Sequence, residues 1–263
     1  MQPLQLDSWR AKRQVLAKHI LESAHDHGPL RILEAGCGSR WNVDLGDLEY
    51  TLTGVDLDEK ALDMRINERR DLQETIVGDL RTVILDDARY DVVYCCNVLE
   101  HVDGAEQVMH NLVRWTRPGG TILVLIPDGR SAKGFLTKLL PHWVHVLFVR
   151  HVQGLASAGK TGFGPYRTYF DPVVSLAGVR RFCAANGLTI DACYSSAYSQ
   201  SANRILTALS QAVAWTVHIV SFGRLTARHA DLTFVIRKPA DPAGRHRSTG
   251  QALPPDDPQR RTP

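Results

Sequence analysis

The sequence predicts an α/β protein with a mostly parallel sheet that is covered by helices on both faces. The main observation is an alternation of short apolar strands and helices along the first half of the chain. Composition agrees, because the 263 residues are 44% apolar and 22% charged. These values are typical of one large hydrophobic core, and they argue against a disordered chain, a coiled coil or a collagen.

Charge and cysteine content exclude several function classes. A formal charge of +3, from 31 Lys and Arg against 28 Asp and Glu, is too small and too scattered to indicate a nucleic-acid partner. The five cysteines are odd in number and form no C-x-x-C pair, so we expect reduced thiols and a cytoplasmic protein. Residues 1–13 carry charges throughout and show no secretory signal.

The elements of the first half follow from periodicity and from turn residues. Apolar spacing predicts a helix over residues 7–24, which ends at His27-Gly28-Pro29. The strands that follow are expected at residues 31–35, 51–56, 74–77, 91–96 and 121–126. Helices are expected over residues 59–69 and from Asp103, as N-cap, to residue 117, where Pro118-Gly119-Gly120 forces a turn.

The alternation breaks after Pro127, where residues 128–170 form a predicted insertion. A helix opened by Asp171-Pro172, a strand over 188–194, a second insertion over 195–230 and a last strand over 231–238 follow. The tail over 240–263 holds almost no apolar residue and is expected to be disordered. The predicted organisation is therefore an N-terminal helix (1–29), one domain (30–239) and this tail.

A glycine-containing turn and a distant carboxylate indicate a nucleoside ligand. Gly36 and Gly38 stand where a buried strand turns into a helix, although a tight turn alone would explain them. Asp56 ends the next strand, about twenty residues on, where a carboxylate can accept hydrogen bonds from a ribose. A dinucleotide would need Gly or Ala at position 41, where Trp41 stands, so a pyrophosphate fits poorly.

Six segments in order resemble class I S-adenosylmethionine-dependent methyltransferases. They are LEAGCG (33–38), GVD (54–56), GDL (78–80), DVV (91–93), NVLEHV (97–102) and RPGG (117–120). The resemblance implies a Rossmann-like, seven-stranded sheet whose last strand is antiparallel, with helical insertions after the fifth and sixth strands. It also implies S-adenosylmethionine as the cofactor. The family's third glycine falls at Arg40, which either pairs with the methionine carboxylate or lies on the surface.

The same resemblance assigns residues to the cofactor. Glu34 and the backbone of the glycine turn would hold the methionine end, Asp56 the ribose, Asp79 with Leu80 the adenine edge, and Asn97 the methionine moiety. The complete set of expected cofactor-binding residues is Glu34, Gly36, Gly38, Asp56, Leu57, Asp79, Leu80, Asn97 and Val98.

Candidate catalytic groups lie near the expected acceptor pocket. Ligands of open α/β sheets bind beyond the carboxyl ends of the strands, so both insertions should border this pocket. His101 could take the proton of an attacking hydroxyl, or it could be a helix-start histidine that the backbone satisfies. Tyr166, Arg167 and Tyr169 either face the substrate or pack at a helix entrance. No metal site is expected, since the histidines at 142, 145 and 151 have no nearby carboxylate.

Both insertions contain long apolar stretches. Residues 139–149 are almost entirely apolar, and residues 205–223 contain no Asp, Glu, Lys or Arg. They could form a lid or the contact of a homodimer, or they could lie on a membrane surface and hold a lipid-like acceptor. A transmembrane span is disfavoured because polar residues interrupt the second stretch, which barely reaches the ~20 apolar residues required.

The sequence therefore predicts methyl transfer to a small hydrophobic or lipid-like acceptor, at a hydroxyl. Two alternatives remain: a membrane-associated scaffold with a vestigial site, and a nicotinamide-dependent oxidoreductase. Glu34, Asp56 and Asp79 argue against the first, and Trp41 argues against the second. The expected location is the cytoplasm, with peripheral contact at the inner face of the membrane.

Overall fold

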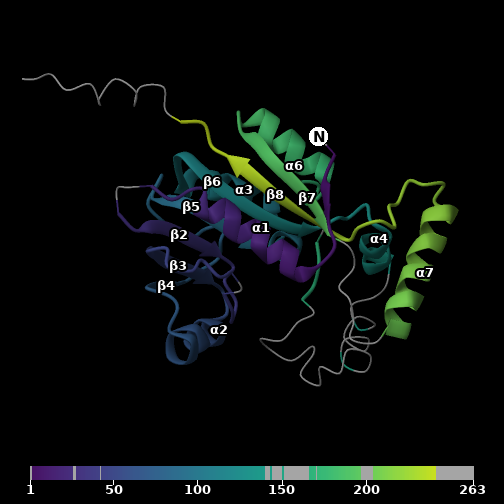
Figure 1. Cartoon of the computed structure of the whole chain (residues 1–263), viewed down its shortest axis with the longest axis horizontal. Coiled ribbons are helices and arrows are strands. Elements are labelled where there is room, and N and C mark those ends of the chain that lie inside the picture. Colours follow the sequence, from purple (N-terminus) through teal and green to yellow (C-terminus); the bar gives the residue numbers. More distant parts are fainter. Residues whose placement is uncertain are drawn as a thin grey trace, which may run out of the picture.

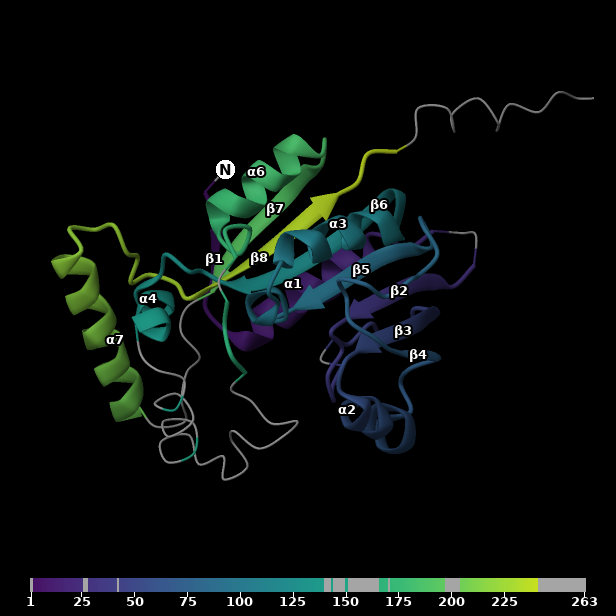
Figure 2. The same ribbon diagram turned by 180° about the vertical axis from the view of Figure 1, so that it is seen from behind.

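A single mixed sheet organises the protein. The computed structural model describes residues 2–25, 28–41, 43–139, 143, 150, 166–169, 171–196 and 204–240. These residues form an eight-stranded sheet in the order β1-β7-β8-β6-β5-β2-β3-β4, with helices on both faces (Figures 1 and 2). The predicted tail and the histidines at 142, 145 and 151 lie outside the described residues, apart from Ala240.

The strands are β1 (Leu4–Leu6), β2 (Leu30–Ala35), β3 (Tyr50–Asp56), β4 (Glu74–Val77), β5 (Tyr90–Cys96), β6 (Thr116–Pro127), β7 (Thr189–Ser196) and β8 (Asp231–Arg237). The helices are α1 (Trp9–Leu21), α2 (Glu59–Met64), α3 (Ala105–Trp115), α4 (Ala132–Leu139), α6 (Leu176–Ala185) and α7 (Arg204–Val220). A π-helix (Arg65–Arg69) continues α2, and a 3-10 turn (Leu99–His101) follows β5.

Strand directions match the predicted topology with one addition. Strands β2 to β6 run parallel, and β8 runs antiparallel between β6 and β7. The prediction of seven strands is wrong by one, because residues 4–6 form β1 and pair in parallel with β7 at the edge of the sheet. The Leu-Gln-Leu alternation of these three largely exposed residues is too short to indicate a strand, so only the partner strand reveals this element.

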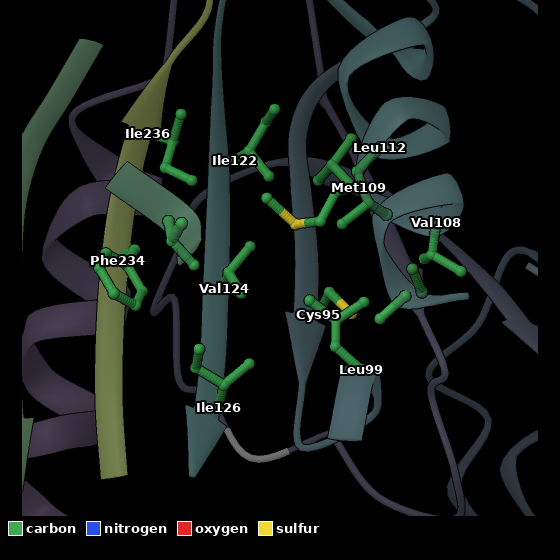
Figure 3. Packing of buried hydrophobic residues seen from close by; sticks show 14 of the residues in the cluster. Cys95, Leu99, Val108, Met109, Leu112, Ile122, Val124, Ile126, Phe234 and Ile236 are labelled. Atoms are coloured by element: carbon green, nitrogen blue, oxygen red, sulfur yellow. The ribbon is translucent and has the colours of Figure 1, made fainter. Parts of the chain in front are cut away.

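Two apolar layers hold the helices to the sheet. On one face, Phe234 of β8, Val124 of β6, Cys95 of β5 and Leu112 of α3 belong to one continuous buried apolar layer (Figure 3). On the other face, Ile32 of β2 contacts the layer formed by α1, whose Leu16 and Ile20 are buried. The strands are apolar on both faces because helices cover both, as a parallel sheet requires.

Several predicted boundaries need correction. Gly104 rather than Asp103 caps α3, and Ser175 rather than Asp171 caps α6. The turn predicted at Pro118-Gly119-Gly120 is an irregularity inside β6, since Tyr90 pairs with Thr116 while Val92 pairs with Thr121. In both helices a residue with good cap propensity stands within four residues of the one that caps the helix.

The two insertions contribute a separate helical unit. Helices α4 and α7 pack together through Ala132, Ala214 and Ala227, with Val217 partly buried against them. Both views place this unit at the end of the sheet opposite β4 (Figures 1 and 2). Of the helices that the structure describes, none has the length and apolar content needed to cross a bilayer.

Candidate functional site

A tight turn follows β2 and forms the floor of the site. Gly36 and Gly38 adopt φ values of 74° and 52°, in the left-handed region that favours glycine. The backbone N–H groups of Gly36 and Cys37 both donate to Val55 O, at 2.8 and 3.1 Å, which ties the turn to β3. A Cβ on Gly36 would overlap the γ-methyl groups of Val98, so glycine here permits the residues after β5 to lie directly on the turn.

Asp56 lies against the same turn. Its Oδ2 accepts from Gly38 N–H at 2.7 Å, and its Oδ1 accepts from Asp58 N–H at 2.9 Å. Each carboxylate oxygen keeps a second lone pair, so the group can still accept hydrogen bonds from the two hydroxyls of a ribose. The structure thus brings Gly38 and Asp56 together as the sequence predicted. Leu57, next in the chain, is exposed beside them and could pack on an adenine ring.

The turn has room for a ligand. A Cβ built on Gly38 would meet no atom within 4 Å, so this backbone borders open space. A cradle of this kind, next to an accepting carboxylate, fits a nucleoside cofactor whose methionine end approaches the backbone closely.

Glu34 is bound behind the turn by a fully buried arginine. Arg65 Nη2 donates to Glu34 Oε2 at 2.8 Å, Nη1 donates to Cys37 O at 3.0 Å, and Nε donates to Asp71 Oδ1 at 2.8 Å. Burial raises the pKa of Glu34, and the Arg65 guanidinium opposes this shift. Sequence reasoning did not find Arg65, because basic residues are ordinary in an exposed helix and nothing local marks this one as buried.

The expected adenine edge lies after β4. Asp79 accepts from Arg81 Nε at 3.0 Å, and these hydrogen bonds hold the pKa of Asp79 below its usual value. Arg81 Nη1 donates to Asp103 O at 3.1 Å, which links this loop to the one after β5. Leu80 is buried, and its carbonyl accepts from Asn111 Nδ2 at 2.8 Å.

The residues after β5 border the glycine turn. Asn97 has a φ of 53°, and its N–H donates to Leu125 O at 3.0 Å, so the chain turns sharply at the end of the strand. Val98 follows and contacts Gly36, as described above. Asn97 and Val98 therefore lie next to the glycine turn, and their contact with the methionine moiety stays a prediction.

Residues 166–169 cross the carboxyl edge and cover His101. His101 Nδ1 donates to Arg167 O at 2.9 Å, and Tyr166 lies edge-on to the imidazole with ring centroids 5.6 Å apart. Tyr169 N–H donates to Glu100 O at 2.8 Å. Burial raises the pKa of Tyr166, and the carboxylates of Asp58 and Asp56 add to the shift. The Tyr166 ring therefore lies near Asp56, the residue expected to bind the ribose.

Glu100 is a buried carboxyl group next to this histidine. Its Oε1 lies 3.8 Å from His101 Nε2, and its Oε2 has no hydrogen-bond partner among the described residues. Burial raises the pKa of Glu100 to about 8, and the nearby Asp231 adds to the shift. A carboxyl group in this environment is largely protonated at neutral pH. No sequence signal distinguishes it from an exposed glutamate at a helix start.

A second histidine–carboxylate pair joins the two insertions. Asp128, directly after β6, accepts from His229 Nε2 at 2.9 Å, and its Oδ1 accepts from Arg130 N–H at 2.9 Å. Because a carboxylate only accepts, the neutral His229 carries its lone pair on Nδ1. Sequence reasoning missed this pair, since 101 residues separate its members and only the antiparallel pairing of β6 and β8 brings them together.

Comparison with known proteins accounts for this geometry. Residues 33–124, which run from β2 into β6 and include the glycine turn, Asp56 and His101, match the family model of the methyltransferase domain. Residues 33–124 therefore form a methyltransferase domain of the class I S-adenosylmethionine-dependent kind. S-adenosylmethionine is accordingly the cofactor, and the open backbone at Gly38 beside Asp56 suits it.

Individual relatives cover part of this methyltransferase. A probable S-adenosylmethionine-dependent methyltransferase of Mycolicibacterium smegmatis is 31% identical over 121 residues, which are 46% of each chain. A ubiquinone biosynthesis O-methyltransferase of Bordetella bronchiseptica is 29% identical over 56% of this chain and 67% of its own. The chain thus spans about half to two thirds of the length of these curated relatives.

Solved structures confirm the fold of the methyltransferase over most of its length. An S-adenosylmethionine-dependent methyltransferase of Methanosarcina mazei superposes with a TM-score of 0.53 at 15% identity. The alignment covers 90% of this chain and 100% of that one. At this identity the likeness shows the shared fold alone and leaves the acceptor open.

Substitution of the two glycines of the turn should affect different properties, stability for Gly36 and cofactor binding for Gly38. We expect Gly36→Ala to lower the free energy of unfolding by more than about 2 kcal/mol, because the new Cβ overlaps Val98. Gly38→Ala should cost only about 1 kcal/mol for its positive φ, yet weaken S-adenosylhomocysteine binding at least about tenfold in calorimetry. Gly46→Ala, with φ 57° and open space, is the matched control for backbone strain. Unchanged affinity in Gly38→Ala would place the cofactor elsewhere.

Breaking the buried ion pair should be costly. Arg65→Met leaves Glu34 buried without a partner, so we expect a loss of about 3–5 kcal/mol in urea unfolding. The double variant Glu34→Gln/Arg65→Met should recover much of this loss. Arg89→Met removes a partly exposed pair with Glu74 and should cost less than about 1 kcal/mol. Equal losses in the two arginine variants would mean that Arg65 does not anchor the turn.

The pKa of Glu100 makes stability depend on pH. The folded protein holds the Glu100 proton up to about pH 8, whereas the unfolded chain releases it near pH 4.5. The free energy of unfolding therefore falls as the pH rises through this window. We expect Glu100→Gln to gain stability relative to the native chain by about 2–4 kcal/mol between about pH 5 and about pH 9. The measurement is urea unfolding of both proteins across this range. A constant difference would show an ordinary pKa.

Proposed function

We propose that the protein transfers the methyl group of S-adenosylmethionine to a hydroxyl of a small hydrophobic or lipid-like acceptor. The observation that carries this proposal is the position of His101, at the carboxyl end of β5, under the segment 166–169. When bound, S-adenosylmethionine supplies a methyl group that its sulfonium has already activated. The protein therefore needs mainly to align the acceptor, exclude water and remove one proton.

The tautomer of His101 suits a general base. A carbonyl oxygen only accepts, so the hydrogen bond to Arg167 O requires the proton on Nδ1 and leaves the lone pair of the neutral ring on Nε2. An acceptor hydroxyl beside Nε2 would give up its proton there as its oxygen forms the new bond to the methyl carbon and the carbon–sulfur bond breaks. Glu100 is largely protonated and its Oε1 lies 3.8 Å from the same Nε2. Once Glu100 ionised, its negative charge would stabilise the imidazolium form of His101.

The segment 166–169 offers an apolar surface to the acceptor. Tyr166 and Tyr169 are half exposed, and the Arg167 guanidinium lies over the Tyr169 ring at 5.4 Å from its centroid. Aromatic rings with one wet edge can cover an apolar acceptor while their hydroxyls remain hydrated. We therefore assign Tyr166, Arg167 and Tyr169 to acceptor binding rather than to proton transfer.

Oxygen as the target atom is supported by the relatives. The Bordetella protein carries O-methylation in its name, in the context of ubiquinone biosynthesis. The apolar stretches of both insertions support an acceptor of hydrophobic or lipid-like character. The proposed location is the cytoplasm. Either a second copy of the chain or the inner face of a membrane would cover the exposed apolar residues of α7.

Label transfer tests the proposal. Purified protein, methyl-labelled S-adenosylmethionine and a cell extract should yield label in the organic phase, and Asp56→Asn should abolish it by weakening cofactor binding. His101→Asn should lower kcat by about 10²–10⁴ and remove the limb of the pH–rate profile that reports deprotonation of the base. His229→Asn is the matched histidine control.

The two histidine variants decide the assignment of the base. A loss confined to His229→Asn would move that role to the Asp128–His229 pair. Label that appears only in the aqueous phase would contradict a lipid-like acceptor, and no transfer at all would contradict methyl transfer.

A further inference from the structure

Charge is divided unequally between the insertions and the rest of the chain. The two insertions, residues 128–170 and 195–230, together contain nine Lys and Arg and one acidic residue, Asp128, which is paired with His229. The remaining residues hold 22 Lys and Arg against 27 Asp and Glu. A protein with a small net charge therefore combines a strongly basic part with an acidic one. Such a separation favours an anionic partner for the basic part.

Helix α7 is apolar on its outer face. Its inner face contacts the first insertion through Ala214 and Val217, and Gln211 Nε2 donates to Ala227 O at 3.2 Å. The large apolar residues on the other side are exposed, and Figures 1 and 2 show no other helix or strand beyond α7. They are Leu209, Val213, Trp215, Ile219 and Val220, followed by Phe222 just past the helix. Surface helices of globular proteins ordinarily carry polar side chains on this side.

Basic residues stand at the base of this surface. Arg224 and Arg228 are exposed in the segment that follows α7, and Arg130 is exposed where the first insertion begins. Thr226 N–H donates to Arg130 O at 3.1 Å, so the segment that holds Arg130 and the segment that holds Arg224 and Arg228 lie side by side. The surface therefore combines apolar side chains with flanking cations, and Asp128, already paired with His229, is the one acidic residue in the two insertions.

We propose that the outer face of α7, with Phe222 and the arginines at its base, docks on the surface of an anionic lipid bilayer. An amphipathic or apolar helix that lies in the interface gains from burial of its side chains in the acyl boundary and from attraction between basic residues and anionic headgroups. Trp215 is suited to this position, since indole rings concentrate at membrane interfaces.

A second copy of the chain fits this surface less well. In a two-fold dimer the same patch faces itself, so Arg224 and Arg228 of both copies would be brought towards one another. The nine basic residues in the insertions of each copy, against the single Asp128, would repel those of the other copy at short range unless a counter-charge were supplied. An anionic bilayer supplies this charge and also accepts the apolar side chains.

The inference is independent of the reaction, because vesicle binding can be measured without a substrate. It also deepens the proposed function. If the acceptor is lipid-like, it would reach the site from the bilayer on which α7 lies. Vesicle binding and methyl transfer are measured in separate assays, so the failure of one proposal can be told from the failure of the other.

Vesicle flotation of the full chain tests the docking surface. We expect binding to vesicles of phosphatidylcholine with phosphatidylglycerol, weak binding to phosphatidylcholine alone, and loss of binding at high salt. Ile219→Asp should weaken the partition coefficient at least about tenfold, because Ile219 is 69% exposed and would lose its apolar contact with lipid. Ile84→Asp is the matched control, since Ile84 is 91% exposed in the loop between β4 and β5, outside both insertions.

A charge variant separates the electrostatic contribution. Arg224→Glu/Arg228→Glu should lower binding to the phosphatidylglycerol vesicles by roughly tenfold or more, while Arg69→Glu/Arg70→Glu, with the same change in net charge, should have little effect. Thermal unfolding and S-adenosylhomocysteine binding of each variant show that it is folded. Equal losses in the matched controls would overturn the proposal.

Two further results would also overturn it. One is no binding to either kind of vesicle. The other is a dimer in sedimentation that Ile219→Asp splits into monomers without any vesicle binding by the native chain, which would assign the face to a second copy.

Discussion

The site depends on one buried guanidinium. Arg65 contacts the end of β2 through Glu34, the glycine turn through Cys37 O and the segment before β4 through Asp71. These three segments meet behind the cofactor turn, and none has another charged partner of equal burial at this point among the described residues. A buried arginine with several acceptors holds its partners in one geometry, because its planar fork fixes the direction of each hydrogen bond. Gly36 and Gly38, whose φ angles are positive, belong to the turn that Arg65 holds in place through Cys37 O.

In front of the turn, contacts between loops set the position of each functional group. Val98 lies on Gly36, Arg81 joins the loop after β4 to Asp103, and residues 166–169 lie on Glu100 and His101. All of these loops leave the carboxyl ends of parallel strands, so the sheet brings them together without any long-range motif in the sequence. Chemistry that requires alignment more than acid–base power suits such a site.

The sequence predicted which residues lie together at the glycine turn better than it predicted what surrounds them. The proximity of Gly36, Gly38 and Asp56 could be predicted because a strand-end turn with positive φ and the end of the next strand leave a local pattern, whereas their role in binding stays a prediction. Arg65, Glu100 and the Asp128–His229 pair were missed, since burial and pairing across 101 residues have no local signature. The edge strand β1 was also not predicted, because its three residues form a strand only through pairing with β7. The roles assigned to Tyr166, Arg167 and Tyr169 remain predictions.

The antiparallel direction of β8 has a mechanical consequence. It starts where β6 ends, so the second insertion returns to the sheet at the point where the first one leaves. Asp128 N–H donates to Ala230 O, Ala132 N–H to Thr226 O and Thr226 N–H to Arg130 O, which fastens the two insertions together at this point. Among the described residues, helices α4 and α7 consequently share this attachment at the ends of β6 and β8 and form one lever arm. A force applied only to the far side of α7 would swing α4 with it, and the start of the first insertion would move relative to the sheet in the same step.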